Sequence, residues 1–194
     1  MSPATPAAPV PTLVVVDVQQ AIDDPRWGPR NNPEAEAVIA KLLAAWRVAG
    51  LPVIHVHHDS TEPDSPYRPG HAGNDPKAVA APLPRDVVVR KTTNAAFVGT
   101  DLEARLRELD AAPVYCGVLT HNSLEATVRL SGNLGFASTV VADACWSVDV
   151  IDRRGRLWPA EDVHQLSLTH LDGEYAAVRS SSQVLADLGR DADR

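Results

Sequence analysis

The run Thr12–Val16, with the sequence TLVVV, is the feature that most constrains how this chain can fold. Its residues are apolar or β-branched, without the alternation of polar and apolar side chains that a half-exposed strand shows. Such a run is typical of a strand that is buried on both faces of a sheet. Because both faces then need a covering layer, the run indicates a parallel sheet with helices on each side.

Strands and helices alternate along the rest of the chain. Five further apolar runs predict strands, at Leu51–His57, Asp86–Arg90, Ala112–Cys116, Ser138–Ala142 and Tyr175–Val178. Segments with apolar residues at helical spacing are found near residues 33–49, 102–109, 123–134, 159–171 and 182–188. This order predicts an α/β fold, with three α/β/α layers built on a six-stranded, mostly parallel sheet with right-handed crossovers.

The length of the chain, 194 residues, suits one domain with a substantial core. The first residues are rich in Pro and Ala, so we expect a short disordered arm at 1–11 and a single domain at 12–194. The same N-terminal segment lacks the basic and apolar regions of a signal peptide. The apolar runs are too short to cross a bilayer, so we expect no membrane partner.

Composition narrows the possible partners and the cellular setting. Hydrophobic residues make up 44% and charged residues 22% of the chain, as in ordinary globular domains. The net charge is −7 and there is no basic stripe, so we do not expect nucleic acid to bind. The two cysteines, Cys116 and Cys145, do not make a disulfide framework, which indicates a reducing cytoplasm. We expect both of them in or near the core.

Three polar residues stand where predicted strands end or where the next helix begins. Asp17 follows the first run, Lys91 follows the third strand, and Ser123 opens the helix after the turn GVLT. The carboxyl ends of parallel strands meet at one edge of a sheet, where open α/β folds place their chemistry. Singly, each residue also fits an ordinary role as a turn residue, a surface charge or a first-turn helix residue. Together they predict an active site built from an acid, a base and a hydroxyl.

Longer stretches of the chain resemble one known family. The stretches are TLVVVDVQ near the start, RKTTNAAFVGTDLEARLR and GVLTHNSLEATVRLSGNLGF in the middle, and VVADACWSVD and AEDVHQLSLTHLDGEYAAV towards the end. In this order they are similar to the isochorismatase-like hydrolase superfamily, also called the cysteine hydrolases, over residues 12–188. That family includes nicotinamidases, carbamoylsarcosine amidohydrolases and isochorismatases, so the resemblance implies a hydrolase with the α/β fold of the family.

The resemblance implies a catalytic triad of Asp17, Lys91 and Ser123, with serine where most members carry cysteine. It also implies an oxyanion hole made by the backbone N–H groups of Leu119 and Ser123, after a cis peptide bond that precedes Leu119. A cysteine thiol ionises near neutral pH, whereas a serine hydroxyl needs a base when it attacks. Asp17 is the base of the triad, and aspartate is weak in that role. We therefore expect removal of Ser123 to harm activity less than removal of Asp17.

Three hypotheses for function follow. The first is hydrolysis of a C–N bond in a small amide, lactam or ureido compound, with Asp17 as general base and then acid, and with Lys91 orienting Asp17. The second is hydrolysis of a vinyl ether, as in isochorismatases, with Asp17 as general acid and without a nucleophile. The third is a binding protein that has lost catalysis, or a cysteine hydrolase in which Ser123 is an engineered change.

Other residues are candidates for the walls of a pocket that takes a small-molecule substrate. They follow strand ends or lie in the long polar stretch from His58 to Pro84, whose length is typical of a functional loop or lid. The candidates are Trp27, His58, Tyr67, Arg68, Phe97, His121, Asn122 and Trp146.

The histidines and the resemblance bear on cofactors and on assembly. The Asp-x-His spacing of the metal-binding nicotinamidases is absent after the second predicted strand, where Asp59 follows His58 directly. We therefore expect no metal and no other cofactor. The resemblance also implies that the chain assembles as a homodimer or a homotetramer.

Overall fold

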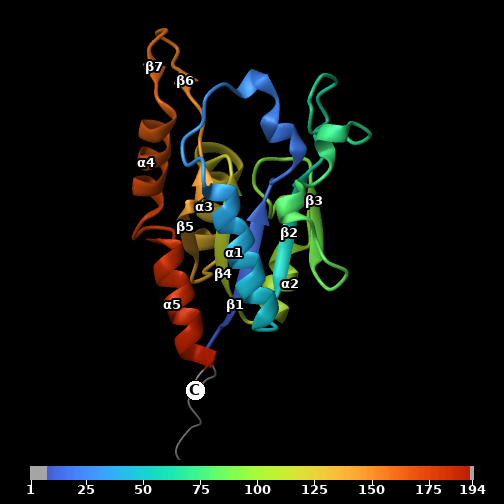
Figure 1. The fold of residues 1–194 in the computed structure, drawn as a ribbon, viewed down its shortest axis with the longest axis vertical. Helices are drawn as coiled ribbons and strands as arrows, with labels where there is room; N and C mark the ends of the chain where they lie inside the picture. Colours follow the sequence, from blue (N-terminus) through green and yellow to red (C-terminus); the bar gives the residue numbers. More distant parts are fainter. Residues whose placement is uncertain (1–7, 193–194) are drawn as a thin grey trace, which may run out of the picture.

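The computed structural model describes residues 8–192, and it describes side chains as far as residue 190. Six strands form one sheet in the order β3-β2-β1-β4-β5-β8, and neighbouring strands run parallel (Figure 1). The strands are β1 (Val10–Val16), β2 (Val53–His58), β3 (Val87–Lys91), β4 (Ala111–Val118), β5 (Thr139–Trp146) and β8 (Ala177–Arg179). The predicted α/β fold with a six-stranded parallel sheet is therefore confirmed.

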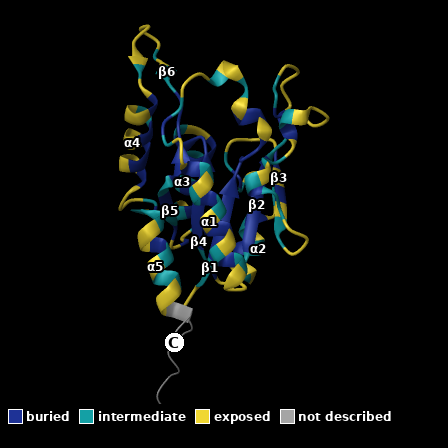
Figure 2. Cartoon of the chain, in the orientation of Figure 1, coloured by how far each residue is buried: buried dark blue, intermediate teal, exposed yellow. Residues whose placement is uncertain are grey.

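Helices cover both faces of this sheet. The helices α1 and α5 contact each other and lie in front of the sheet in Figure 1, whereas α2 and α3 lie behind it. Their bounds, with that of α4, are α1 (Ala35–Val48), α2 (Leu102–Glu108), α3 (Glu125–Asn133), α4 (Ala160–Leu171) and α5 (Ser181–Ala192). Figure 2 shows buried strands and helices with exposed outer sides, so the core lies between the layers.

Shorter elements complete the fold. A two-stranded antiparallel hairpin extends beyond the sheet next to α4 and is formed by β6 (Val150–Ile151) and β7 (Leu157–Trp158) (Figure 1). The short 3-10 helices are η1 (Gln20–Asp23), η2 (Pro25–Trp27), η3 (Ala72–Asn74) and η4 (Ala78–Ala80). Within residues 8–192, no helix combines the length and the apolar character that crossing a membrane needs.

The run that predicted an interior strand lies in the middle of the sheet. Leu13 and Val14 are fully buried, and Val14 pairs with Ile54 of β2 on one side and with Tyr115 of β4 on the other. The strand begins at Val10, two residues earlier than predicted, so the end of the expected disordered arm is strand. Residues 1–7 of that arm lie outside the described residues.

The fifth strand is longer than the sequence predicts. β5 continues to Trp146 through Asp143, the polar residue that follows the predicted run. The Asp143 carboxylate accepts hydrogen bonds from the N–H and the hydroxyl of Ser181, at 2.7 and 2.6 Å, where α5 begins. Asp143 therefore fixes the first residue of α5 to β5.

The turn after β4 positions the predicted nucleophile. Gly117 has a φ of 120°, and a Cβ at this residue would lie 2.1 Å from the carbonyl oxygen of Val16, so only glycine lets β4 approach β1 this closely. The peptide bond between Val118 and Leu119 is cis, as the family resemblance implies. The predicted helix then begins with the kinked turn η5 (Thr120–Leu124), in which Asn122 has non-helical backbone angles, and continues as α3.

The long polar segment between β2 and β3 folds back onto the strand ends. The side-chain amide of Asn74 donates to the carbonyl oxygens of His58 at 3.0 Å and of Tyr67 at 2.7 Å. The backbone carbonyl of Asn74 accepts a hydrogen bond from the Gln19 side chain at 2.8 Å. One buried asparagine thus ties this segment to the residues that follow β1 and β2.

Candidate active site

Asp17, Lys91 and Ser123 lie together at the carboxyl edge of the sheet. Lys91 Nζ donates to Asp17 Oδ2 at 2.7 Å and to Ser123 Oγ at 3.3 Å. Asp17 follows β1, Lys91 ends β3, and Ser123 lies in η5 after β4. Their exposed fractions are 4%, 1% and 7%. The ammonium therefore links the carboxylate to the hydroxyl in a largely desolvated position, where electrostatic attraction is stronger than in water.

The Asp17 carboxylate is hydrogen-bonded at one oxygen and without a partner at the other among the described residues. Asp17 has a φ of 54°, in the left-handed region, and its N–H donates to the Val56 carbonyl at 2.9 Å. Oδ2 receives the hydrogen bond from Lys91, whereas Oδ1 is buried and has no hydrogen-bond partner among residues 8–192. Because an ionised carboxylate only accepts hydrogen bonds, Oδ1 is the oxygen that can take a proton from a bound molecule.

A cleft of about 210 Å³ adjoins this cluster. Its size suits a small molecule and is below the range typical of drug-sized ligands. Four of the predicted pocket residues line it together with Asp17, Leu119 and Ser123, and these four are Trp27, His58, Tyr67 and Asn122. Asp17, Ser123 and half of the predicted wall residues therefore line one cleft, and Lys91 contacts Asp17 and Ser123 without lining it.

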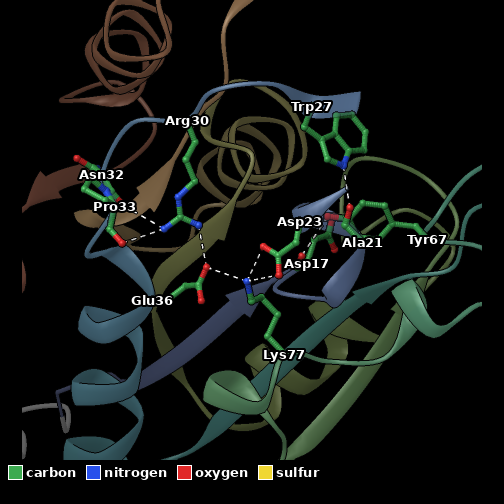
Figure 3. A network of polar contacts seen from close by, with 10 residues as sticks. All are labelled: Asp17, Ala21, Asp23, Trp27, Arg30, Asn32, Pro33, Glu36, Tyr67 and Lys77. Atoms are coloured by element: carbon green, nitrogen blue, oxygen red, sulfur yellow. Dashed lines mark hydrogen bonds and ion pairs between the residues drawn. The ribbon is translucent and has the colours of Figure 1, made fainter. Parts of the chain in front are cut away.

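Aromatic rings form one wall of the cleft. The Tyr67 ring packs edge-on against Trp27, with centroids 6.3 Å apart, and against His58, with centroids 5.7 Å apart. The Trp27 indole N–H donates to the Ala21 carbonyl at 2.8 Å, and the Tyr67 hydroxyl donates to the Asp17 carbonyl at 3.5 Å (Figure 3). Burial raises the pKa of Tyr67, and the charge of Asp17 raises it further. Tyr67 is therefore a neutral phenol at physiological pH.

Ion pairs behind this wall tie together the segments that carry it. Lys77 Nζ lies 2.6 Å from Asp23 Oδ1 and 2.9 Å from Glu36 Oε1, and Arg30 Nη1 lies 2.7 Å from the same Glu36 oxygen (Figure 3). Burial opposes ionisation of Glu36, but hydrogen bonds from Lys77 and Arg30 outweigh it and lower the pKa of Glu36. The network links η1 to α1 and to the segment that precedes β3.

The other four predicted wall residues lie outside the cleft. Arg68 is exposed, and its Nη1 lies 3.4 Å from the carbonyl oxygen of Pro63. Phe97 stacks on Phe136, with ring centroids 6.1 Å apart. These two side chains therefore contribute to a loop and to the core, although Arg68 lies in the long polar segment and Phe97 follows a strand end in the sequence.

The remaining two of these four residues are His121, in the turn η5 itself, and Trp146, at the end of β5. His121 Nδ1 lies 3.0 Å from Ser147 Oγ, and His121 lines a separate hollow beside α4. Trp146 is fully buried, with the Arg30 guanidinium 4.2 Å from its ring centroid. Neither side chain therefore lines the substrate cleft.

Several residues that line the cleft were not predicted from the sequence. They are Ile22, Ser60, Ser65, Asn94 and Val118. Ser60 and Ser65 belong to the long polar segment, and Asn94 follows β3 three residues after Lys91. The position of Asn94 just beyond a strand end is the sequence signal that could have identified it.

The predicted oxyanion donors lie at the edge of the same cleft. Leu119 and Ser123 both line it. The carbonyl of Leu119 accepts hydrogen bonds from the N–H groups of Asn122 at 3.0 Å and Leu124 at 3.3 Å, which fixes the turn between the two predicted donors.

Both cysteines lie in the core and neither lines the cleft. Cys116 and Cys145 are fully buried, as predicted, and the Cys145 thiol lies 3.1 Å from the Val141 carbonyl oxygen. Burial raises the pKa of Cys145 to about 12 and that of Cys116 well above its usual value. The two thiols therefore stay protonated and do not replace the missing cysteine at position 123.

The histidines of β2 lie on alternate sides of the strand. His58 lines the cleft, whereas His55 and His57 are buried and pack against each other, with ring centroids 6.2 Å apart. Among residues 8–192, no group of three or more His, Cys, Asp or Glu side chains is arranged to hold a metal ion.

Comparison with known proteins decides the family. Residues 11–183 match the family model of the isochorismatase domain. This chain belongs to the isochorismatase family. A structure from Chromobacterium violaceum, assigned to the hydrolases of this family, is 50% identical with a TM-score of 0.91, covering 98% of this chain and 99% of that chain. The isochorismatase family protein YrdC of Bacillus subtilis is 37% identical over 177 residues, which are 90% of this chain and 94% of that protein.

A further relative of this isochorismatase family member is named for its activity. The streptothricin hydrolase of Streptomyces noursei is 38% identical over 150 residues, which are 73% of this chain and 51% of that protein. The predicted family membership is thus confirmed, and the chain is an isochorismatase-family hydrolase.

Proposed function

We propose that this hydrolase cleaves a C–N bond in a small amide, lactam or ureido compound. The observation that carries the proposal is the Lys91 ammonium, which contacts both the Asp17 carboxylate and the Ser123 hydroxyl beside the cleft. In this scheme Asp17 takes a proton from the attacking hydroxyl and later gives it to the leaving nitrogen. Lys91 orients Asp17 and stabilises the negative charge that develops on the attacking oxygen.

Attack on the carbonyl carbon needs an oxygen nucleophile and a site for the resulting oxyanion. When the Ser123 hydroxyl is the nucleophile, loss of the amine leaves an acyl ester on Ser123, and a water molecule that Asp17 deprotonates then cleaves this ester and restores the hydroxyl. When that hydroxyl is removed, the water molecule attacks the carbonyl carbon directly. The backbone N–H groups of Leu119 and Ser123 stabilise the oxyanion. The similarity to a streptothricin hydrolase supports C–N hydrolysis as the reaction.

The polar lining of the cleft favours an uncharged substrate. Besides the carboxylate of Asp17, it consists of the hydroxyls of four residues, two amides and one imidazole, which belong to Ser60, Ser65, Tyr67, Ser123, Asn94, Asn122 and His58. No Lys or Arg side chain is among the described residues that line the cleft. A substrate carboxylate in this small space would meet the unpartnered oxygen of Asp17 and be repelled. Isochorismate carries two carboxylates, so this lining supports C–N hydrolysis over the vinyl-ether alternative.

The test is a panel of small amides, lactams, ureido compounds and isochorismate, assayed with the wild type, Asp17→Asn, Ser123→Ala and Ser123→Cys. We expect the wild type to hydrolyse an uncharged C–N compound and Asp17→Asn to be inactive. We expect Ser123→Cys to form a detectable covalent adduct, because a thiol beside the Lys91 ammonium is a better nucleophile than a hydroxyl. If isochorismate alone is turned over, the reaction is vinyl-ether hydrolysis. If compounds of the panel bind but none is turned over, the chain is a binding protein.

A further inference from the structure

The Lys91 ammonium has a third contact in addition to Asp17 and Ser123. His58 Nδ1 lies 3.4 Å from Lys91 Nζ. Together with Asp17 Oδ2 at 2.7 Å and Ser123 Oγ at 3.3 Å, it gives three acceptors to an ammonium that has three N–H groups. Lys91 is 1% exposed, and an N–H without an acceptor would be costly in such a position. His58 thus completes the surroundings of the ammonium.

This contact sets the protonation state of His58. An ammonium donates hydrogen bonds and accepts none, so His58 Nδ1 presents a lone pair and the ring proton is on Nε2. Burial lowers the pKa of His58, and the nearby charge of Lys91 lowers it further. The ring is therefore neutral when it holds the ammonium.

The backbone of His58 is fixed independently of Lys91, and its ring is packed against a neighbour. The His58 N–H donates to Gln19 Oε1 at 2.7 Å, and the His58 carbonyl accepts from Gln19 Nε2 at 3.1 Å and from Asn74 Nδ2 at 3.0 Å. Gln19 is fully buried, and the ring packs edge-on against Tyr67. The backbone contacts fix where the side chain starts, and the packing against Tyr67 restrains the ring, so Nδ1 is kept near the end of β3 as a positioning group requires.

We propose that His58 is a positioning residue that holds the Lys91 ammonium between Asp17 and Ser123. The inference rests on the proposed hydrolysis by that cluster. A proton on Nδ1 removes the lone pair and places a second positive charge beside Lys91. The contact between His58 and Lys91 is therefore lost when the pH falls below the pKa of His58. The other groups that face His58 are the carboxylates of Asp17 and Asp59 and the backbone of Thr93, which favour the protonated ring, and the neutral phenol of Tyr67.

Two substitutions of His58 distinguish a role in positioning the Lys91 ammonium from a role in packing the wall of the cleft. In His58→Asn the side-chain oxygen can replace Nδ1 as the acceptor and does not titrate, whereas His58→Leu provides no acceptor. Misplacing a catalytic group costs up to about 10²-fold, so we expect His58→Leu to lower kcat about tenfold or more with KM little changed. We expect His58→Asn to stay within about threefold of the wild-type kcat and to lose the acid limb of the kcat/KM profile that His58 causes.

His57→Asn is the matched control, because His57 is the neighbouring residue of β2 and lies outside the lining of the cleft. We expect this variant to keep both the kcat and the acid limb of the wild type. Equal losses in His58→Asn and His58→Leu, with an unchanged acid limb, would overturn the positioning role and leave His58 as a wall residue.

Nitrogen NMR of the labelled imidazole tests the inference without any turnover. We expect an unprotonated Nδ1 and a protonated Nε2 at neutral pH, and a His58 pKa below the usual 6.5. A protonated Nδ1 at neutral pH would overturn the inference even in an active enzyme. If the substrate panel shows no hydrolysis but the NMR result holds, the contact with Lys91 stands and the proposed reaction is what fails.

Discussion

The strands β2 and β3 carry two clusters that are chemically alike, each with a carboxylate, a basic side chain and a histidine. Near their amino ends, Asp86 Oδ2 accepts from Arg47 Nη2 at 2.5 Å and from the Leu83 N–H at 2.8 Å, and it lies 3.3 Å from His55 Nε2. At their carboxyl ends, Lys91 joins Asp17 to His58 and Ser123.

The two clusters differ in how fully the carboxylate is satisfied. Both Asp86 and Asp17 have nearly buried side chains, exposed by 2% and 6%. One Asp86 oxygen carries three contacts that tie α1 to β2 and to the start of β3, whereas Asp17 keeps Oδ1 buried without a partner. We call the Asp86 cluster closed, because its contacts stabilise the fold. We call the Asp17 cluster open, because a carboxylate oxygen without a partner next to a cleft is suited to proton transfer.

The largest expected effect is the loss of activity in Asp17→Asn. We expect kcat/KM to fall by about 10²–10⁴-fold, because the amide cannot act as the general base. The melting temperature should stay close to that of the wild type, as measured by circular dichroism. Retention of more than about a tenth of the activity would remove Asp17 from the mechanism.

The matched change in the closed cluster, Asp86→Asn, should act on stability alone. The substitution removes the charge that holds Arg47 and weakens the contact with His55. We expect the free energy of unfolding to fall by about 1–3 kcal/mol, measured by urea denaturation, with kcat unchanged. A drop in kcat with an unchanged free energy of unfolding would show that Asp86 acts in catalysis, which contradicts the difference proposed between the two clusters.

Acid should lower the free energy of unfolding through two buried histidines of β2, His55 and His57. Burial is the main cause that lowers the pKa of His55 and of His57, each from 6.5 to about 4. The unfolded chain therefore binds more protons than the folded protein as pH falls from 6.5 towards 4, so stability is full above 6.5 and declines below it. Urea denaturation should show a loss on the order of 2 kcal/mol for each of the two histidines at about pH 5, and a pH-independent midpoint over this range would contradict the expectation.

The smallest expected effect is that of Ser123→Ala. Water can take the place of the hydroxyl, and the backbone N–H of residue 123 persists in the variant. We expect kcat to fall by less than about tenfold, or roughly 1.4 kcal/mol. A variant as inactive as Asp17→Asn, together with an acyl adduct mapped to Ser123 by mass spectrometry, would instead establish an efficient serine nucleophile.

Strand ends were easier to predict than pocket walls. The uninterrupted run at Thr12–Val16 predicted an interior strand, and parallel pairing then brings the ends of β1 and β3 to one edge. The walls depend on where side chains point after long-range packing, which spacing does not reveal. Phe97 and Trp146 follow strand ends like Lys91 does, yet they turn towards Phe136 and Arg30.

The glycine at position 117 constrains how relatives of this chain can be recombined. A Cβ there would meet the backbone of Val16 at 2.1 Å, and a backbone atom cannot rotate away as a side chain can. A chimaera that takes β1 from one parent and β4 from another must therefore inherit this glycine together with the strand path that faces it. Directed-evolution libraries should keep Gly117 and vary positions such as Ser60, Ser65 and Asn94. These three residues line the cleft, so changing them alters its shape without disturbing the contact between β1 and β4.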